Sequence, residues 1–185
     1  MLGSTSSIQI KHIFGFKPDT KGSVFHVDDT KIIYTAGHNV VIYSKEDHLM
    51  QFFPGLDVSQ EITSIVISPL RRHLAVAEKA EPAVITVYDT HTQRKKRMMN
   101  TPDCQSSQYV SMAFAPGQEN KYLIAMGGPP DWTLVYWHWE KPRVVSSIQV
   151  SAGNPVHEVS FNILDHNLGI VATGEDVFRW YKVVD

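Results

Sequence analysis

The stretch Tyr109-Val110-Ser111-Met112-Ala113-Phe114-Ala115 decides the fold, because similar runs occur twice more in the chain. One begins 47 residues earlier, at Ile62, and the other begins 47 residues later, at Val156. In each copy two large apolar residues lie two positions apart, so both side chains project from the same face of a β-strand. These pairs are Ile65 with Ile67, Met112 with Phe114, and Val159 with Phe161. The alternation by two favours a repeat built from strands over one built from helices.

Each copy is followed by turn residues and then by further β-rich runs, which makes about four short strands per unit. The fourth run of a unit is more polar, as expected for an outermost strand with water on one side. The predicted units span residues 22–55, 60–100, 108–150 and 155–185. The sequence therefore predicts an all-β fold, a WD40-type β-propeller of about four blades of four antiparallel strands.

The last unit supplies three strands, which leaves an edge that tends to recruit another strand. The β-rich run 8–16 stands before the first unit and could supply this strand, closing a ring. Two interpretations stay open. Either the chain closes by itself as a four-bladed ring, or it is part of a larger ring with further blades beyond Asp185. We favour the larger ring.

Composition excludes several classes of function. Seventeen Lys and Arg residues against nineteen Asp and Glu residues give a net charge of −2, which offers no global attraction to nucleic acid or to an anionic membrane. The single cysteine, Cys104, cannot form an intramolecular disulfide, so the sequence favours an intracellular protein. No secretory signal and no apolar run of membrane-spanning length is found in the sequence.

No sequence motif of a known catalytic or cofactor site is found. The nine histidines show no metal-ligand spacing, and we expect neither a metal nor a cofactor. Cys104 has no basic neighbour that would lower its pKa, so we interpret it as incidental. The alternative is a propeller hydrolase with polar groups such as His157, Asp165 and Glu175 at the central channel. Few residues support this alternative, and we predict that the chain is not an enzyme.

Two basic clusters fall in one predicted blade and form the candidate protein-docking surface. One is the run 94–97 on an outer strand, and the other is a pair of arginines in a turn. Docking onto an acidic protein competes with a simpler interpretation, a solvated edge that repels strand addition. Alternation in the run 132–139 predicts that most of its aromatic residues pack between blades, with Trp132 the best exposed candidate. The candidate docking residues are Arg71, Arg72, Arg94, Lys95, Lys96, Arg97 and Trp132.

Several strings resemble the N-terminal WD-repeat region of the family of cilia- and flagella-associated protein fifty-seven, also called WD-repeat protein sixty-five. The most specific is Leu134-Val135-Tyr136-Trp137-His138-Trp139-Glu140-Lys141. Others occur in the same order as in the family, and the resemblance covers nearly the whole chain after about residue 12. They are Gln51-Phe52-Phe53-Pro54-Gly55, the run 67–75, the run 110–114 and the run 154–161.

The resemblance implies a non-catalytic adaptor of the motile ciliary axoneme, found in the cytoplasm and cytoskeleton. Family members join N-terminal propellers to a long coiled coil and sit on doublet microtubules near the inner dynein arms and the nexin-dynein regulatory complex. The expected partners are therefore axonemal proteins. This sequence departs from the family because it contains no coiled coil, which puts self-association through such a coil in doubt. An adaptor of another cytoplasmic complex is the alternative.

Overall fold

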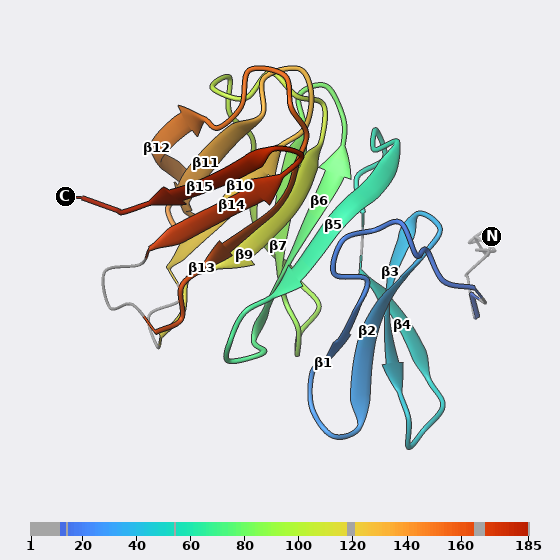
Figure 1. Ribbon diagram of the computed structural model, residues 1–185. Helices are drawn as coiled ribbons and strands as arrows, with labels where there is room; N and C mark the ends of the chain where they lie inside the picture. The colour runs from blue at the N-terminus through green and yellow to red at the C-terminus, as the bar shows by residue number, and fades with distance from the viewer. Residues whose placement is uncertain (1–11, 14, 54, 118–120, 165–168, 185) are drawn as a thin grey trace.

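The computed structural model describes residues 12, 13, 15–53, 55–117, 121–164 and 169–184. These residues form fifteen β-strands and no helix, arranged in four antiparallel sheets (Figure 1). Three sheets have four strands and the last has three. The all-β, WD40-like fold of about four blades is thereby confirmed. The described residues also contain no helix long and apolar enough to cross a membrane.

The four sheets follow one another along the chain, and each is called a blade here. Blade 1 contains β1 (Val24–His26), β2 (Lys31–Ala36), β3 (Asn39–Ser44) and β4 (Met50–Phe53). Blade 2 contains β5 (Glu61–Ile67), β6 (His73–Lys79), β7 (Val84–Asp89) and β8 (Lys95–Met99). Blade 3 contains β9 (Tyr109–Phe114), β10 (Tyr122–Gly127), β11 (Thr133–His138) and β12 (Arg143–Gln149). Blade 4 contains β13 (Val156–Phe161), β14 (Ile170–Gly174) and β15 (Val177–Tyr181).

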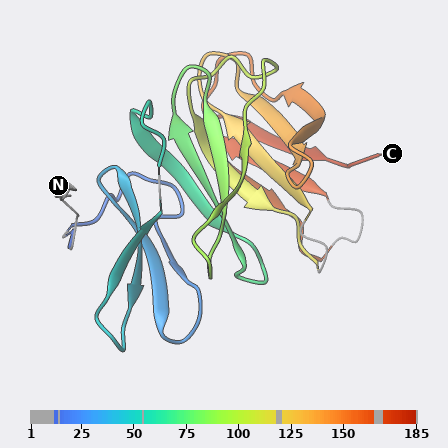
Figure 2. The same cartoon turned by 180° about the vertical axis from the view of Figure 1, so that it is seen from behind.

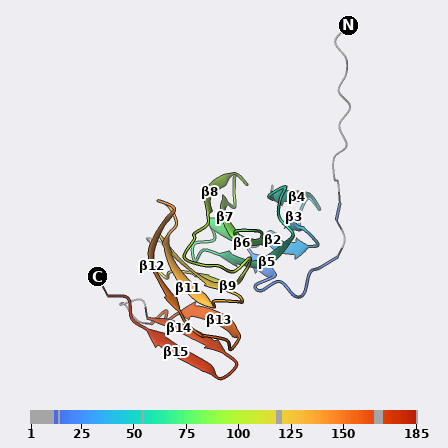
Figure 3. The same ribbon diagram turned by 90° about the horizontal axis from the view of Figure 1, so that it is seen from above.

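Within each blade the strands pair in sequence order, so the first strand lies at one edge and the last at the other. The first strands β5, β9 and β13 of blades 2, 3 and 4 lie side by side near the axis (Figures 1 and 2). Seen from above, the blades follow an arc whose two ends are blade 1 and blade 4 (Figure 3). The assignment of the four sheets to one partial propeller domain stays a prediction.

Apolar side chains fill each space between neighbouring blades. We call the face that a blade turns toward the next blade its leading face, and the opposite one its trailing face. The leading face of blade 1 packs on the trailing face of blade 2 in one cluster, and two further clusters join blades 2 and 3 and blades 3 and 4. The repeated pairs of the sequence all lie on trailing faces, and they are buried because each trailing face packs on the blade before it. The pairs are Ile65 with Ile67, Met112 with Phe114, and Val159 with Phe161.

Hydrogen bonds join neighbouring first strands close to the axis. The hydroxyl of Thr63 on β5 donates to the carbonyl oxygen of Tyr109 on β9 at 2.8 Å. One blade further on, the backbone N–H of Val159 on β13 donates to the hydroxyl of Ser111 at 3.2 Å, and this pair is buried. Before β1, the backbone at Lys21 forms a parallel bridge with β5. Each blade is therefore tied to its neighbour by polar contacts at the centre as well as by apolar packing.

The outermost strands β8 and β12 are largely exposed, as their polar sequences predict. The predicted closing strand at 8–16 falls mostly on residues 8–11 and 14, which lie outside the described residues. The described residues of that run are not in a strand, and the N–H of the next residue, Lys17, donates to Thr35 of β2 in blade 1. A strand that closes a ring on blade 4 therefore stays a prediction.

Candidate functional site

The structure brings the two basic clusters of blade 2 together. Arg71 and Arg72 lie in the turn between β5 and β6, and the cations of the run 94–97 lie just before and along β8; all are exposed. Thr90 joins the two regions through two hydrogen bonds. Its hydroxyl donates to the carbonyl oxygen of Arg71 at 2.7 Å, and its backbone N–H donates to the carbonyl oxygen of Arg72 at 3.0 Å. We call this surface the basic surface; its members are Arg71, Arg72, Arg94, Lys95, Lys96 and Arg97.

A buried carboxylate, that of Asp89 at the end of β7, organises the basic surface. One of its oxygens accepts the backbone N–H groups of His91 and Thr92 at 3.0 and 2.9 Å, which shapes the turn into β8. The other oxygen lies 3.6 Å from the ammonium of Lys96 and 3.9 Å from the guanidinium of Arg72. The side chain of Asp89 thus holds one cation from each cluster. The sequence analysis did not identify Asp89 as part of this surface.

The pKa of Asp89 lies below its ordinary value of 3.8. Burial on its own would raise this pKa, but hydrogen bonds from Thr92 and His91 and the charge of Lys96 outweigh burial. Because the folded pKa is depressed, the charged form stabilises the fold above the ordinary pKa, and this stabilisation is lost as the pH falls through the folded pKa.

We expect Asp89→Asn to lower the free energy of unfolding by about 1–3 kcal/mol near neutral pH, because the hydrogen bonds from His91 and Thr92 lose their charged acceptor and Lys96 and Arg72 lose their anionic partner. The difference from the unchanged protein should shrink as the pH falls from about 4, where the unfolded chain begins to protonate this carboxylate, through the lower pKa of the folded state. Urea unfolding at several pH values measures this. The matched control is Asp29→Asn at an exposed position. If the difference in free energy of unfolding between Asp89→Asn and the unchanged protein stays constant down to acid pH, the stabilising role of the Asp89 carboxylate is contradicted.

The expectation that Trp132 is exposed was wrong. Trp132 is only 8% exposed and belongs to the apolar cluster between blades 3 and 4. It precedes β11 in a left-handed backbone conformation, φ 43°, and its N–H donates to Gly128, so the chain turns sharply inward here. The predicted packing of the following run is confirmed: Trp137 lies between blades 2 and 3, and Tyr136 lies between blades 3 and 4. Trp132 is therefore not part of the basic surface.

The exposed tryptophan is Trp180 on β15, which sequence reasoning did not single out. Phe178, on the same strand and two residues earlier, is exposed as well. The signal was present in the repeat, because these two residues occupy the positions of Tyr136 and Leu134 in blade 3. Their exposure follows from the place of blade 4 at the end of the arc.

A recess of about 490 Å³ lies where the first strands begin, on the axis of the arc. Its lining includes Lys17, Lys21, Glu61 and His157, so both signs of charge meet there. Of the residues proposed for a hydrolase, His157 lies 3.6 Å from Glu175 in an exposed pair, and Asp165 lies outside the described residues.

The remaining candidate groups offer little reactivity. Cys104 is buried in the connection between blades 2 and 3, and burial raises the pKa of its thiol to about 11, which keeps it protonated at neutral pH. Among the described residues, no group of three or more His, Cys, Asp and Glu side chains is placed to share a metal ion.

Sequence comparison shows which known proteins this chain is similar to. No family model matches the chain. The chain is similar to cilia- and flagella-associated protein 57 of Mus musculus, with 37% identity over 98% of this chain and 15% of that protein. It is similar to cilia- and flagella-associated protein 57 C of Tetrahymena thermophila, with 34% identity over 100% of this chain and 15% of that protein. Cilia- and flagella-associated protein 44 of Mus musculus is 23% identical over 95% of this chain and 9% of that protein.

These similarities run through all four blades, because the matched segments cover nearly the whole chain. The chain spans 15% of the length of the first two relatives. Over the part of those proteins that it matches, the chain belongs to the cilia- and flagella-associated protein 57 family.

Proposed function

We propose that the chain is a non-catalytic scaffold of the motile ciliary axoneme that holds partner proteins at the rims of its blades. The observation that carries this proposal is the 37% identity to a cilia- and flagella-associated protein along almost the entire chain. The fold supports it, since blades present loops and outer strands to solvent while their apolar faces are buried between sheets.

The proposed partners are components of the doublet microtubule, the inner dynein arms and the nexin-dynein regulatory complex. Support for this finer placement is the resemblance of the sequence to its family. Self-association through a coiled coil, which the resemblance implies, is proposed only for family members that contain such a coil. An adaptor of another cytoplasmic complex is the alternative, and it predicts no retention on axonemes.

The basic surface is the proposed contact with the axoneme. Its six cations are exposed on one blade, and only part of their charge is offset by the buried Asp89. Arg97 on β8 also donates to the carbonyl oxygen of Glu140, 2.7 Å away, so this part of the surface adjoins blade 3. A positive surface held in place by hydrogen bonds favours an acidic protein surface as its partner, and such contacts weaken as salt screens them.

We expect reversal of two of these charges, Arg94→Glu with Lys95→Glu, to weaken retention on isolated axonemal doublets at least about tenfold. Both side chains are exposed, so the fold should be unaffected. Lys96 is left in place because it pairs with Asp89. The measurement is co-sedimentation of the purified chain with doublets over a series of salt concentrations.

The matched control is Lys45→Glu, a charge reversal at an exposed residue of blade 1 that lies outside the basic surface. It should leave sedimentation close to that of the unchanged chain. Retention that is equal for all three proteins would remove the basic surface from the proposal. Failure of the unchanged chain to sediment with doublets at low salt would remove the axonemal function itself.

A further inference from the structure

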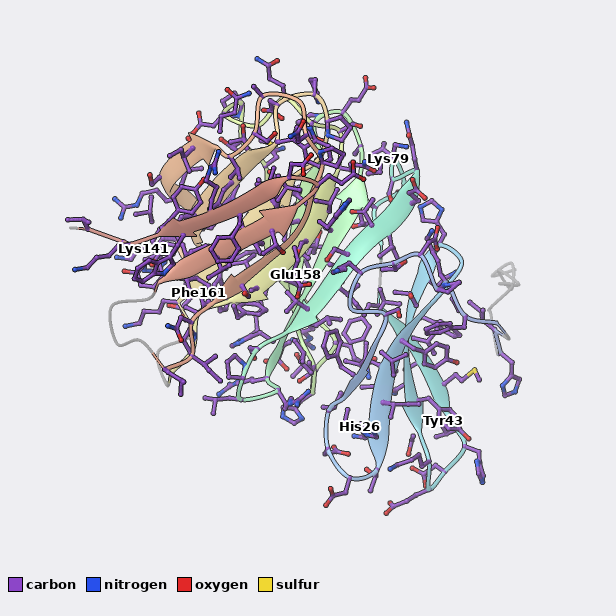
Figure 4. The ribbon with its side chains drawn as sticks, viewed as in Figure 1. His26, Tyr43, Lys79, Lys141, Glu158 and Phe161 are labelled. Carbon is purple, nitrogen blue, oxygen red and sulfur yellow. The ribbon has the colours of Figure 1, made fainter. Side chains whose placement is uncertain are left out.

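Two arginines of the basic surface are held in place by neighbouring blades without losing their charge. The guanidinium of Arg71 donates to the carbonyl oxygen of His26 on blade 1 at 3.0 Å. The guanidinium of Arg97 donates to the carbonyl oxygen of Glu140, in the turn between β11 and β12 of blade 3, at 2.7 Å. His26 and Lys141, the residue next to Glu140, are labelled in Figure 4. Because carbonyl groups carry no net charge, both guanidiniums are fixed in position and stay positive.

The remaining cations of the basic surface are only partly neutralised. The carboxylate of Asp89 is shared between Arg72 and Lys96, so it offsets at most one of these two charges. Arg94 and Lys95 form no ion pair with any residue that the structure describes. The surface therefore presents an excess of positive charge that is available to a partner.

Both turns that carry the basic surface contain a residue in an unfavourable backbone conformation. Arg71 has a φ of 60°, and Gln93, which directly precedes the basic run, has a φ of 56°. Glycine adopts this left-handed region without the steric cost that a Cβ atom brings. Backbone strain of this kind gathers at functional sites. An arginine in a position that glycine would fill more easily indicates that its side chain has a use there.

The basic run lies along a free sheet edge. β8 is the last strand of blade 2, where it pairs with β7 alone among the described strands, and it lies on the outside of the arc (Figure 3). Lys95 lies opposite Tyr88, which packs toward blade 1, and Arg97 lies opposite Val87, which packs toward blade 3. Positive side chains therefore lie on both faces of the sheet beside this edge.

Protection of an outer strand against pairing does not account for the basic run. Basic side chains are one means by which edge strands avoid unwanted partners. The corresponding strand of blade 3, β12, contains a single basic residue, Arg143, although Val145 and Ile148 on the same strand are exposed apolar residues. An outer strand of this fold therefore does not require a basic run, and the cations of β8 need another explanation.

We propose that the basic surface binds an acidic segment of a partner protein in extended form, laid along the free edge of β8. Successive side chains of an extended chain point to opposite sides, so carboxylates at neighbouring positions meet the cations on both faces. The backbone of the segment pairs with β8 beyond the bulge at Lys96. Segments rich in Asp and Glu bury too little apolar surface to fold alone, so they are available in this form.

This inference rests on the basic surface proposed above as the contact with the axoneme, and it names the class of partner that this surface takes. The first test is a titration of a dye-labelled octaglutamate peptide with the full chain, followed by fluorescence anisotropy. The peptide should bind at low salt, and its affinity should fall as salt screens the charges. Arg94→Glu with Lys95→Glu should weaken binding at least about tenfold.

The matched control is Lys45→Glu with Arg143→Glu, which reverses two exposed charges outside the basic surface. It should bind the peptide like the unchanged chain. Circular dichroism checks that each variant is folded.

Two further measurements test the extended form of the bound segment. A peptide with the same number of glutamates, alternating with serines, places all its carboxylates on one face, so it should bind at least about threefold more weakly than octaglutamate. Hydrogen exchange of backbone amides, followed by NMR, should slow within residues 97–99 of β8 when octaglutamate is bound, because strand pairing shields them. The amides of β12 should be unaffected.

Three results would overturn the proposal. One is no binding of octaglutamate to the folded, unchanged chain at low salt. A second is equal or tighter binding of a single-stranded RNA of the same charge, which indicates a surface for nucleic acid. The third is unchanged exchange within residues 97–99 while the peptide is bound, which indicates a contact with a folded acidic surface.

The outcomes also separate this inference from the proposed function. If the charge-reversed variant loses retention on doublets but octaglutamate does not bind, the basic surface remains the axonemal contact and the extended acidic segment is removed. If octaglutamate binds as described but the unchanged chain does not sediment with doublets, the partner class stands and the axonemal function is removed.

Discussion

Alanine in place of Leu123 should lower the free energy of unfolding by about 2–5 kcal/mol. Leu123 on β10 is fully buried and lies between Phe114 of β9 and Trp137 of β11 in the cluster that joins blades 2 and 3. Both neighbours are large and fixed by their own strands, so they cannot collapse into the space that the leucine leaves. A loss of this size is a large share of the stability of an ordinary domain.

Urea unfolding followed by tryptophan fluorescence measures this loss. The matched control is Leu164→Ala, since Leu164 is 86% exposed and its loss should change the free energy of unfolding by less than about 0.5 kcal/mol. Equal effects at the two leucines would contradict the position of Leu123 in a packed interface.

Alanine in place of Gly22 should cost about 2–5 kcal/mol, through two effects that add. Gly22 has a φ of 69°, in the left-handed region that disfavours residues with a Cβ atom. A Cβ atom there would also lie far inside van der Waals contact with the carbonyl oxygen of Ile65 on β5. The backbone around Gly22 runs directly against blade 2, so the substitution should loosen blade 1 from its neighbour.

Two other glycines separate the two effects. Gly37 has a φ of 57° and no atom within 4 Å of its would-be Cβ, so Gly37→Ala should cost only the conformational part, about 1–2 kcal/mol. Gly153 has neither constraint, and Gly153→Ala should be close to neutral. The measurement is again urea unfolding. If Gly22→Ala costs no more than Gly37→Ala, the close approach to Ile65 is not a feature of the protein in solution.

The sequence alone predicted the strands and the packing between blades, because both depend on a local pattern. Alternation by two decides which side chains share a face, and a buried face needs apolar residues at every second position. This is why Val135 and Trp137 could be assigned to one interface and Leu134 and Tyr136 to the other. The pattern holds in every blade whose two faces are covered by its two neighbouring blades.

Exposure and electrostatics could not be predicted in the same way. Trp180 stands in a strand that alternates like the others, and its exposure depends on what lies beside blade 4. Trp132 turns inward because of a left-handed backbone conformation that its neighbouring prolines do not predict. The role of Asp89 requires that two turns far apart in sequence lie together, which only the paired strands of blade 2 bring about.

The hydrogen bonds between first strands have a mechanical consequence. They join Thr63 to Tyr109 and Val159 to Ser111 near the axis, whereas the outermost strands β8 and β12 are largely exposed. A bending force applied at the rim acts first on the exposed contacts of the outer strands, such as the hydrogen bond from Arg97 to Glu140, and it spreads these strands before the buried centre yields. In an assembly that beats, such a part would flex at its periphery and stay rigid at its hub.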